Sequence, residues 1–145
     1  MRRRTQRQEE IRKIVRRERI RTQRELVERL KPAGFECTQA TVSRDITEMG
    51  VRKLPEGVYV LAEDLHLQRM IADLVVGVVR SENLVLVKAS TGTAPGVAAA
   101  LDAADLDGVL GSVAGDDTIL VLAISAADAE ALTDTLDGYR GRPRR

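Results

Sequence analysis

The sequence is poor in the residues that carry most metal, disulfide and base-stacking chemistry. Its 145 residues include one cysteine, one histidine and three aromatic side chains. The lone Cys37 excludes an internal disulfide, and with His66 as the single histidine the usual zinc ligand sets are missing, so we expect no metal site. Phe35, Tyr59 and Tyr139 are too few for a stacking platform that binds single-stranded nucleic acid.

Long apolar runs are missing as well. No stretch approaches the roughly 20 residues that a transmembrane helix needs. The arginine-rich start is not followed by an apolar segment, so it lacks the pattern of a secretory signal peptide. We therefore expect a cytoplasmic protein with no membrane partner. With 43% hydrophobic residues, the chain can build one ordinary domain or two small ones.

A nearly neutral total charge hides two halves of opposite sign. The formal net charge is +1, but residues 1–53 hold sixteen Lys and Arg against eight Asp and Glu, a net of +8. Residues 54–145 hold seven against fourteen, a net of −7. The basic half is typical of a nucleic-acid-binding surface, and the acidic half of an assembly or cation-sensing module.

The basic half has the pattern of a winged helix-turn-helix domain over 1–62. Apolar residues at helical spacing predict a first helix that ends near Arg17, preceded by a basic arm that is either mobile or in contact with phosphates. Thr22-Gln-Arg-Glu25 has the form of a capping box for a second helix. After a third helix, two short strands around Pro55-Glu56-Gly57 form the wing.

The third predicted helix, from the N-cap Thr38 to Gly50, carries the candidate DNA contacts. Its apolar residues should face the other helices, which leaves the polar ones on or beside the outer face. Arginine can bind guanine, glutamine can bind adenine, and hydroxyl groups can bind phosphates. Such helices also occur in domains that bind no nucleic acid, but the local charge of +8 favours binding. The candidate contacts are Gln39, Thr41, Ser43 and Arg44.

The acidic half predicts the order β-β-α-β-β-α over 71–138, after a polar linker over 63–70. The expected strands are 71–79, 84–89, 109–114 and 118–124, and the expected helices are 94–104 and 126–136. This α+β order implies one mixed or antiparallel sheet with both helices on one face. The other face would be rich in Val, Leu and Ile, so we expect a homo-oligomer that buries it. Residues 139–145 form a basic tail that we expect to be disordered.

Asp116 and Asp117 are the strongest candidates for a sensor. They lie in a turn that follows Gly115, between two aliphatic strands. Two adjacent carboxylates repel each other, and a cation with several N–H donors relieves that repulsion through charge-assisted hydrogen bonds. Arginine or a metal ion would fit, although Gly-Asp-Asp is also ordinary chemistry for a solvated turn.

The chain resembles the bacterial arginine repressor family over nearly its whole length. Val42-Ser43-Arg44-Asp45 matches the Ser-Arg pair of that family's recognition helix, and Leu110-Gly-Ser-Val-Ala-Gly-Asp-Asp-Thr-Ile119 matches its C-terminal signature almost residue for residue. The resemblance implies a transcriptional regulator that represses arginine biosynthesis and could also activate arginine catabolism. It implies a winged helix that binds double-stranded operator DNA. It also implies a C-terminal oligomerisation domain that forms homo-trimers and, with L-arginine as co-repressor, homo-hexamers.

The resemblance also assigns roles to single residues. Ser43 and Arg44 would be the chief DNA contacts, with Gln39 and Thr41 nearby. Arginine would bind between trimers, with its cationic groups held by Asp116 and Asp117, assisted by Asp102.

One stretch departs from the family pattern. Many members have an amide-bearing or similar polar side chain in the loop before the 94–104 helix, where this chain has Ala94-Pro95-Gly96, so that contact would come from backbone groups or be absent. The departure motivates an alternative, a regulator of similar layout that answers to a different amino acid or to none. A third interpretation, an enzyme holding metal ions on Asp116 and Asp117, lacks a further carboxylate at strand spacing and a nucleotide pocket, so we expect no enzyme.

Overall fold

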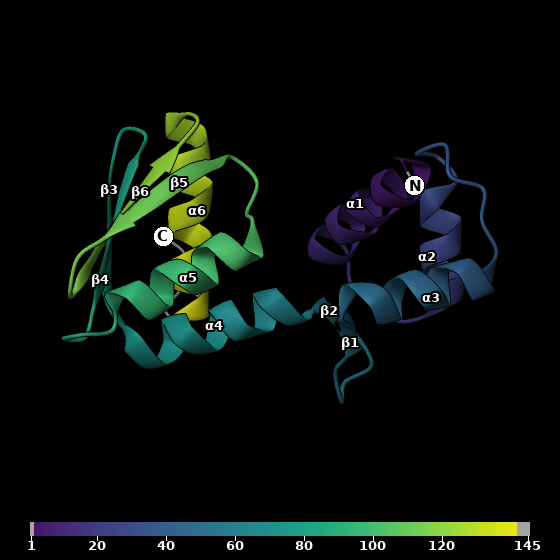
Figure 1. Ribbon diagram of the computed structural model, residues 1–145, viewed down its shortest axis with the longest axis horizontal. Helices are drawn as coiled ribbons and strands as arrows, with labels where there is room; N and C mark the ends of the chain where they lie inside the picture. Colours follow the sequence, from purple (N-terminus) through teal and green to yellow (C-terminus); the bar gives the residue numbers. More distant parts are fainter. Residues whose placement is uncertain (1, 142–145) are drawn as a thin grey trace. The chain divides into compact units, whose positions relative to one another are not determined.

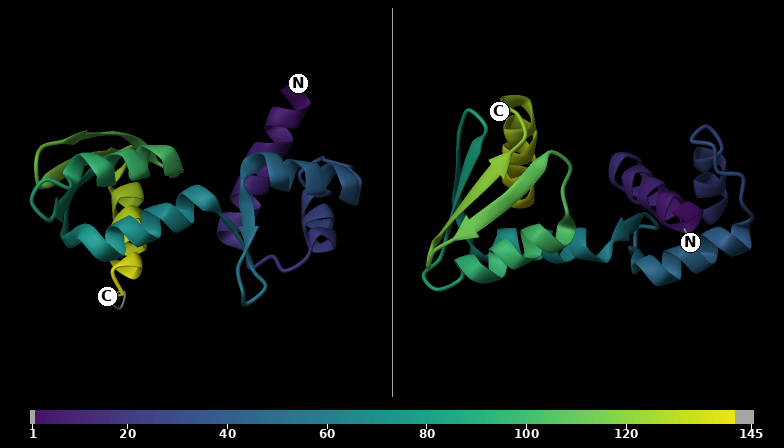
Figure 2. Two further views of the ribbon diagram at one scale, coloured as in Figure 1. Left: turned by 60° about the horizontal axis from the view of Figure 1, so that its bottom comes forward. Right: turned by 45° about the horizontal axis from the view of Figure 1, so that its top comes forward.

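The computed structural model describes residues 2–141, which divide between Ala62 and Glu63 into two compact units. The first unit consists of three helices and a β-hairpin, and the second of a four-stranded sheet with helices (Figures 1 and 2). The predicted α+β fold class is confirmed. Within the described residues, none of the helices combines the length and the apolar character needed to cross a membrane.

The first unit begins with three helices. They are α1 (Arg2–Arg17), α2 (Gln23–Leu30) and α3 (Gln39–Met49). As predicted, hydroxyl groups cap two of them: Thr22 Oγ1 accepts from Glu25 N at 3.1 Å, and Thr38 Oγ1 accepts from Thr41 N at 3.2 Å. Helix α3 ends at Gly50, whose φ of 70° lies in the left-handed region that favours glycine.

The hairpin of the first unit is the wing. Strands β1 (Val51–Lys53) and β2 (Tyr59–Leu61) pair antiparallel. Leu54 N donates to Val58 O at 2.8 Å to close the turn, and Tyr59 N donates to Ile20 O at 2.9 Å, which ties the hairpin to the segment between α1 and α2. The unit's core consists of Ile11, Ile14, Val15, Ile20, Leu26, Leu30, Val42, Ile46, Val51, Tyr59 and Leu61.

The start of the chain is helical, whereas the sequence suggested a basic arm that is either mobile or in contact with phosphates. Helix α1 begins at Arg2 and includes the arginines assigned to the arm. Arg4 pairs with Glu48 and Arg7 with Asp45, both on α3. Arginine is a good helix former, and these partners offset part of its charge. Because the partners lie 44 and 38 residues away in sequence, the local pattern could not show them.

The second unit contains a single antiparallel sheet. Its elements are α4 (Ala62–Leu74), β3 (Val75–Ser81), β4 (Leu84–Ala89), α5 (Ala94–Ala104), β5 (Val109–Ala114), β6 (Thr118–Ala123) and α6 (Ala126–Tyr139). The strand order is β3-β4-β6-β5, and each neighbouring pair is antiparallel. Of the two predicted alternatives, a mixed or an antiparallel sheet, the structure has the antiparallel one.

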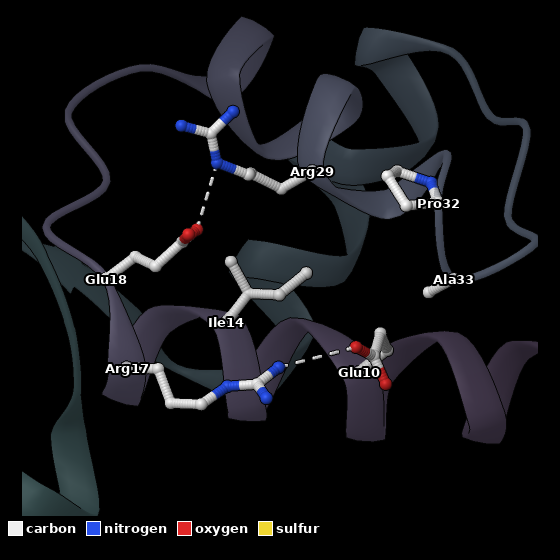
Figure 3. Close-up of a pocket in the computed structure, with 7 residues that line it drawn as sticks. All are labelled: Glu10, Ile14, Arg17, Glu18, Arg29, Pro32 and Ala33. Atoms are coloured by element: carbon white, nitrogen blue, oxygen red, sulfur yellow. Dashed lines mark hydrogen bonds and ion pairs between the residues drawn. The ribbon is translucent and has the colours of Figure 1, made fainter.

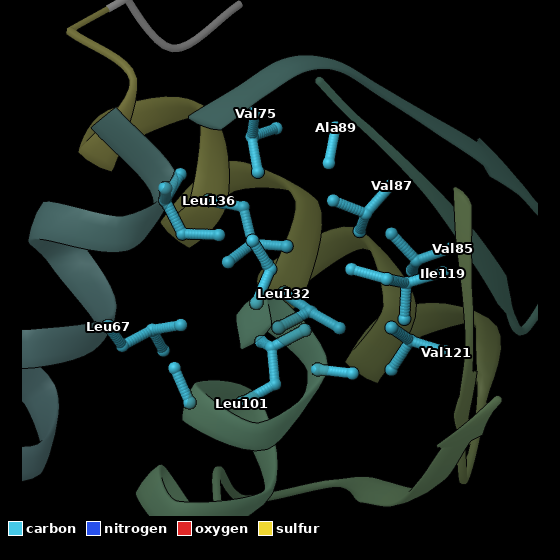
Figure 4. Close-up of a cluster of buried hydrophobic side chains, with 14 of the residues drawn as sticks. Leu67, Val75, Val85, Val87, Ala89, Leu101, Ile119, Val121, Leu132 and Leu136 are labelled. Carbon is cyan, nitrogen blue, oxygen red and sulfur yellow. The ribbon is translucent and has the colours of Figure 1, made fainter. Parts of the chain in front are cut away.

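One face of this sheet and the three helices enclose the core. Alternate residues of the central strands point into it, as Val85, Val87, Ile119 and Val121 show (Figure 4). The helices contribute Leu67, Leu101, Leu132 and Leu136, drawn in the same figure. The predicted placement of the helices on one face is confirmed, with α4 added to them. The opposite face carries exposed apolar side chains, among them Val79 and Val113.

Helix α4 corrects two expectations, the linker over 63–70 and the start of a strand at Ile71. Leu67 and Ile71 are fully buried, and Met70 and Leu74 pack against the same core. This is helical spacing, which the polar residues between them concealed. Glu63 and Asp64 lie in the first turn of α4, where negative charge is favourable.

The end of α6 also differs from expectation. The helix continues to Tyr139, and Arg140 then anchors it: Nη1 donates to Asp137 Oδ1 at 3.1 Å and Nη2 donates to Val76 O at 2.7 Å. The first residues of the predicted basic tail are therefore part of the fold. Residues 142–145 of that tail lie outside the described residues.

Candidate DNA-binding and ligand-binding sites

Helix α3 keeps its apolar side toward the first core and its polar side outward. Val42 and Ile46 are buried, whereas Gln39 and Arg44 are exposed and Thr41 and Ser43 are half-buried. Thr41 Oγ1 shares a hydrogen bond of 3.1 Å with the Thr38 hydroxyl. The four predicted DNA contacts thus lie in the first two turns of one helix, and two of them, Gln39 and Arg44, are exposed.

Asp45 on α3 has a role that the sequence analysis did not predict. It is 1% exposed and is the one buried charged residue among those described. Arg7 donates to it through Nε at 2.5 Å and Nη2 at 3.0 Å. Burial raises the pKa of the Asp45 carboxyl, but the hydrogen bonds from Arg7 and Gln8 outweigh it and leave the pKa lowered. The sequence held one indication of this burial: Asp45 lies three residues after Val42, and residues at that spacing share a helix face.

The wing adds positive charge that the sequence reasoning left unassigned. Arg52 and Lys53 on β1 are exposed, and the Lys53 ammonium lies 5.4 Å from the centroid of the Tyr59 ring. Arg21 Nη1 donates to Glu56 O at 3.1 Å and so supports the wing's turn. Two adjacent basic residues on the first strand of the predicted hairpin could have indicated this contribution from the sequence.

The Asp116–Asp117 turn, which joins β5 to β6, is held against the loop that precedes α5. Ala94 N donates to Asp116 O at 3.1 Å, and Gly92 N donates to Asp116 Oδ2 at 3.2 Å. Ala89 N donates to Asp117 O at 2.8 Å. Both aspartates are exposed. The fold therefore fixes the backbone of the turn while both carboxylates remain open to solvent.

Lys88 is a second component of this site that the sequence did not reveal. Its Nζ donates to Thr118 Oγ1 at 2.8 Å, and that hydroxyl donates to Asp117 Oδ1 at 2.8 Å. Lys88 lies on β4 directly opposite Thr118 on β6. The Thr118 hydroxyl thus links the positive charge of Lys88 to Asp117, one of the carboxylates predicted to bind the ligand.

Asp102 stands apart from the other two aspartates in the same chain. It lies on α5 eight residues after Ala94, about 12 Å further along the helix axis. Its Oδ1 accepts from Ser112 Oγ at 3.3 Å. The other two aspartates accept from different donors, Gly92 N for Asp116 and Thr118 Oγ1 for Asp117. Among the residues 2–141, no group of three or more His, Cys, Asp or Glu is placed to hold a metal ion.

A groove of about 480 Å³ lies elsewhere, on the first unit (Figure 3). Ile14 lies in it, and two ion pairs border it: Arg17–Glu10 at 3.7 Å and Arg29–Glu18 at 3.0 Å. None of the predicted site residues lines this groove.

The two units together define a two-domain DNA-binding transcriptional regulator. Residues 2–67 match the family model described as "Arginine repressor, DNA binding domain", and residues 71–138 match "Arginine repressor, C-terminal domain". The chain therefore belongs to the arginine repressor family.

Curated relatives agree with the family models. The chain is 48% identical over 139 residues to an arginine repressor of Thermus thermophilus, and this alignment covers 88% of the chain and 85% of the relative. It is 45% identical over 128 residues to one of Carboxydothermus hydrogenoformans, covering 81% and 85%. It is 40% identical over 140 residues to one of Deinococcus deserti, covering 89% of each.

Proposed function

We propose that this protein is an L-arginine-responsive repressor of arginine biosynthesis that acts in the cytoplasm on operator DNA. The observation that carries the proposal is the turn at Asp116 and Asp117: its backbone is fixed by hydrogen bonds from Ala89 N and Ala94 N, and its two carboxylates are exposed. A fixed pair of negative charges suits the guanidinium or α-ammonium group of free arginine. Activation of arginine catabolism is a further role consistent with the same machinery.

The DNA-binding half uses α3 as the recognition helix. In helix-turn-helix domains the N-terminal residues of this helix contact base edges in the major groove. Gln39 and Arg44 are exposed there, with the hydroxyls of Thr41 and Ser43 beside them. Arg52 and Lys53 on the wing would contact phosphates, which position the domain but carry no sequence information.

The ligand-binding half needs contacts from more than one subunit. Two ionic contacts supply roughly 3–6 kcal/mol, whereas a micromolar ligand needs about 8 kcal/mol. The loop before α5 offers little more: Ala94 N already donates to Asp116 O, and Pro95 has no N–H group. A neighbouring subunit would supply the remaining contacts, and Asp102, distant from the turn in its own chain, is available for a site shared in that way.

The outer face of the sheet is the surface through which we expect subunits to associate. Strand register aligns Val79, Leu86, Leu120 and Val113 in one row across all four strands. Val79 is 61% exposed and Val113 is 68% exposed. Burying this row would form the homo-trimer, and arginine shared between trimers would then form the homo-hexamer. Ligand binding and assembly would be one coupled equilibrium, and a hexamer would bind paired half-sites with avidity.

The test joins ligand and assembly. We expect calorimetric titration of the wild-type protein with L-arginine to release or absorb heat, and sedimentation to show a larger particle when arginine is present. Asp117→Ala should lose both responses, whereas Asp107→Ala, an exposed aspartate outside the turn, should keep them. No heat with the wild type, or an equal response from Asp117→Ala, would contradict the sensor.

A second candidate is a regulator of the same layout that answers to another amino acid or to none. The stretch Ala94-Pro95-Gly96 favours it, since it offers no polar side chain to the ligand. A thermal-shift screen of the twenty amino acids separates the two candidates. The arginine hypothesis requires the largest shift with L-arginine.

A further inference from the structure

Helices α1 and α3 are joined by a cluster of charged and polar side chains to which the proposed function assigns no role. Its members are Arg4, Arg7 and Gln8 on α1, and Asp45 and Glu48 on α3. The Arg7 guanidinium binds the Asp45 carboxylate through two hydrogen bonds, Nε to Oδ2 at 2.5 Å and Nη2 to Oδ1 at 3.0 Å. Gln8 Nε2 bridges the two acids, donating to Asp45 Oδ1 at 3.1 Å and to Glu48 Oε2 at 3.0 Å.

Burial separates the two ion pairs of this cluster. The side chains of Arg7 and Asp45 are 16% and 2% exposed, whereas those of Arg4 and Glu48 are 51% and 35% exposed. An exposed pair fixes little, because water competes for both partners. A buried pair behaves differently, since removal of one partner leaves an uncompensated charge. The planar, two-point contact also sets a geometry that a single hydrogen bond would not.

The position of this pair links it to DNA recognition. Asp45 directly follows Ser43 and Arg44 on α3, and successive residues of an α-helix are rotated by about 100°. Holding Asp45 against α1 therefore fixes the direction in which Ser43 and Arg44 point. The pair has an electrostatic consequence too. An unpaired Asp45 carboxylate next to these residues would repel the DNA phosphates, and Arg7 neutralises it.

We propose that Arg7 and Asp45 are positioning residues for DNA recognition: their buried ion pair fixes the rotation of α3 and aims Ser43 and Arg44 at the duplex. Arg7 is then an internal partner of α3 and not a phosphate contact, although it lies in the most basic stretch of the chain. The inference rests on the proposed role of α3 as the recognition helix.

The experiment uses the full chain and three variants: Arg7→Gln, Asp45→Asn and the double variant. Binding to an operator duplex and to a random-sequence duplex is measured over a series of salt concentrations. We expect Asp45→Asn to lower operator affinity about tenfold, while random-sequence binding, which depends on phosphate contacts, is maintained. A role in stability alone would not separate the two duplexes.

The double variant and the salt dependence make the test decisive. Gln and Asn can still hydrogen-bond to each other without charge, so the double variant should bind the operator better than either single variant. The slope of log affinity against log salt should stay at its wild-type value in Arg7→Gln. A slope reduced by about one unit would show that Arg7 contacts a phosphate and would overturn the inference. If the single variants unfold, a double variant that binds no better than they do also overturns it.

Two reference measurements separate this inference from the proposed function. Glu18→Gln with Arg29→Gln removes an exposed ion pair of the same unit that does not involve α3, and operator affinity should change by less than about twofold. Arg44→Ala tests α3 itself. Unchanged operator binding in Arg44→Ala would remove the assigned role of the helix. Weakened binding in Arg44→Ala, with wild-type binding in the Arg7 and Asp45 variants, would overturn the positioning role alone.

Discussion

At the scale of single residues, the two candidate sites differ in how exposed their carboxylates are. Asp45 is buried and satisfied by Arg7 and Gln8, so it serves the fold of the DNA-binding unit. Asp116 and Asp117 are exposed, and the fold fixes mainly their backbone. A buried, paired charge holds structure, whereas an exposed and crowded pair of like charges favours binding of a cation.

The pH dependence of stability should reveal the Asp45 pair. Burial raises the pKa of this carboxyl, but the hydrogen bonds from Arg7 and Gln8 lower the pKa by more, so the net direction is down. A carboxyl whose pKa is lower in the folded state stabilises the fold above its unfolded pKa of about 4, and this stabilisation is lost as the pH falls through the folded pKa. Denaturant unfolding from pH 6 to pH 3 should therefore show a steeper loss of stability in the wild type than in Asp45→Asn. Parallel curves would contradict the prediction.

Thr118 offers a finer test of the ligand site. Thr118→Val removes the hydroxyl that joins Lys88 to Asp117 and leaves the Asp117 side chain less well oriented. We expect arginine affinity to fall by about 1 kcal/mol, the usual contribution of one hydrogen bond, in a calorimetric titration. Thr135→Val on α6 removes a comparable hydroxyl outside the site and should leave the affinity unchanged. Equal affinities in both variants would mean that the Thr118 bond does not orient Asp117.

At the scale of elements, the sequence was informative where turns and caps mark the boundaries. The predicted bounds of β4, α5 and β5 agree with the structure, because Gly92, Gly108 and the Asp116–Asp117 turn separate uniform apolar runs. Helix α4 was missed because polar residues concealed the spacing of Leu67 and Ile71.

Contacts that depend on pairing across the chain lay beyond the local pattern. Asp45 meets Arg7 from 38 residues away, and Lys88 meets Thr118 only through the register of β4 and β6. The residue types of the candidate sites were therefore predictable, but their supporting partners were not. Ser43, Arg44, Asp102, Asp116 and Asp117 remain predictions as binding residues.

Gly108 tests how the start of α6 is built. Its φ of 78° lies in the left-handed region, and a Cβ there would lie 2.5 Å from Asp128 Cγ. Asp128 belongs to the cap of α6, where its N–H donates to Ser125 Oγ at 3.1 Å. Gly108→Ala should therefore destabilise the second unit by more than about 2 kcal/mol, from backbone strain and a displaced cap together.

The matched control for this glycine is Gly92→Ala. Gly92 also has a φ of 78°, but a Cβ there meets nothing within 4 Å, so this variant measures the backbone strain alone. Thermal unfolding of both variants gives the comparison. Equal losses of stability would show that the contact with Asp128 relaxes at no cost.

At the scale of the whole molecule, the two units divide the work by charge. Residues 1–62 hold sixteen Lys and Arg against nine Asp and Glu, a net of +7 that attracts DNA phosphates, whereas residues 63–145 hold seven against thirteen, a net of −6 that repels them. A single winged helix offers few base contacts, so its affinity for an operator depends on how many copies are joined. The apolar row on the outer face of the sheet is the feature that would join them.

Val113 tests that surface directly. It is 68% exposed at the β5 end of the apolar row, so Val113→Asp should fold but would place a charge in the interface between subunits. We expect sedimentation to show monomers. Affinity for a full operator should fall by about a hundredfold or more as avidity is lost, whereas affinity for one half-site should stay within about twofold. Ala131→Asp adds the same charge on α6, which covers the opposite face of the sheet, and should assemble normally. A Val113→Asp protein with the mass of the wild type would show that subunits associate through another surface, and that the exposed row has a different partner.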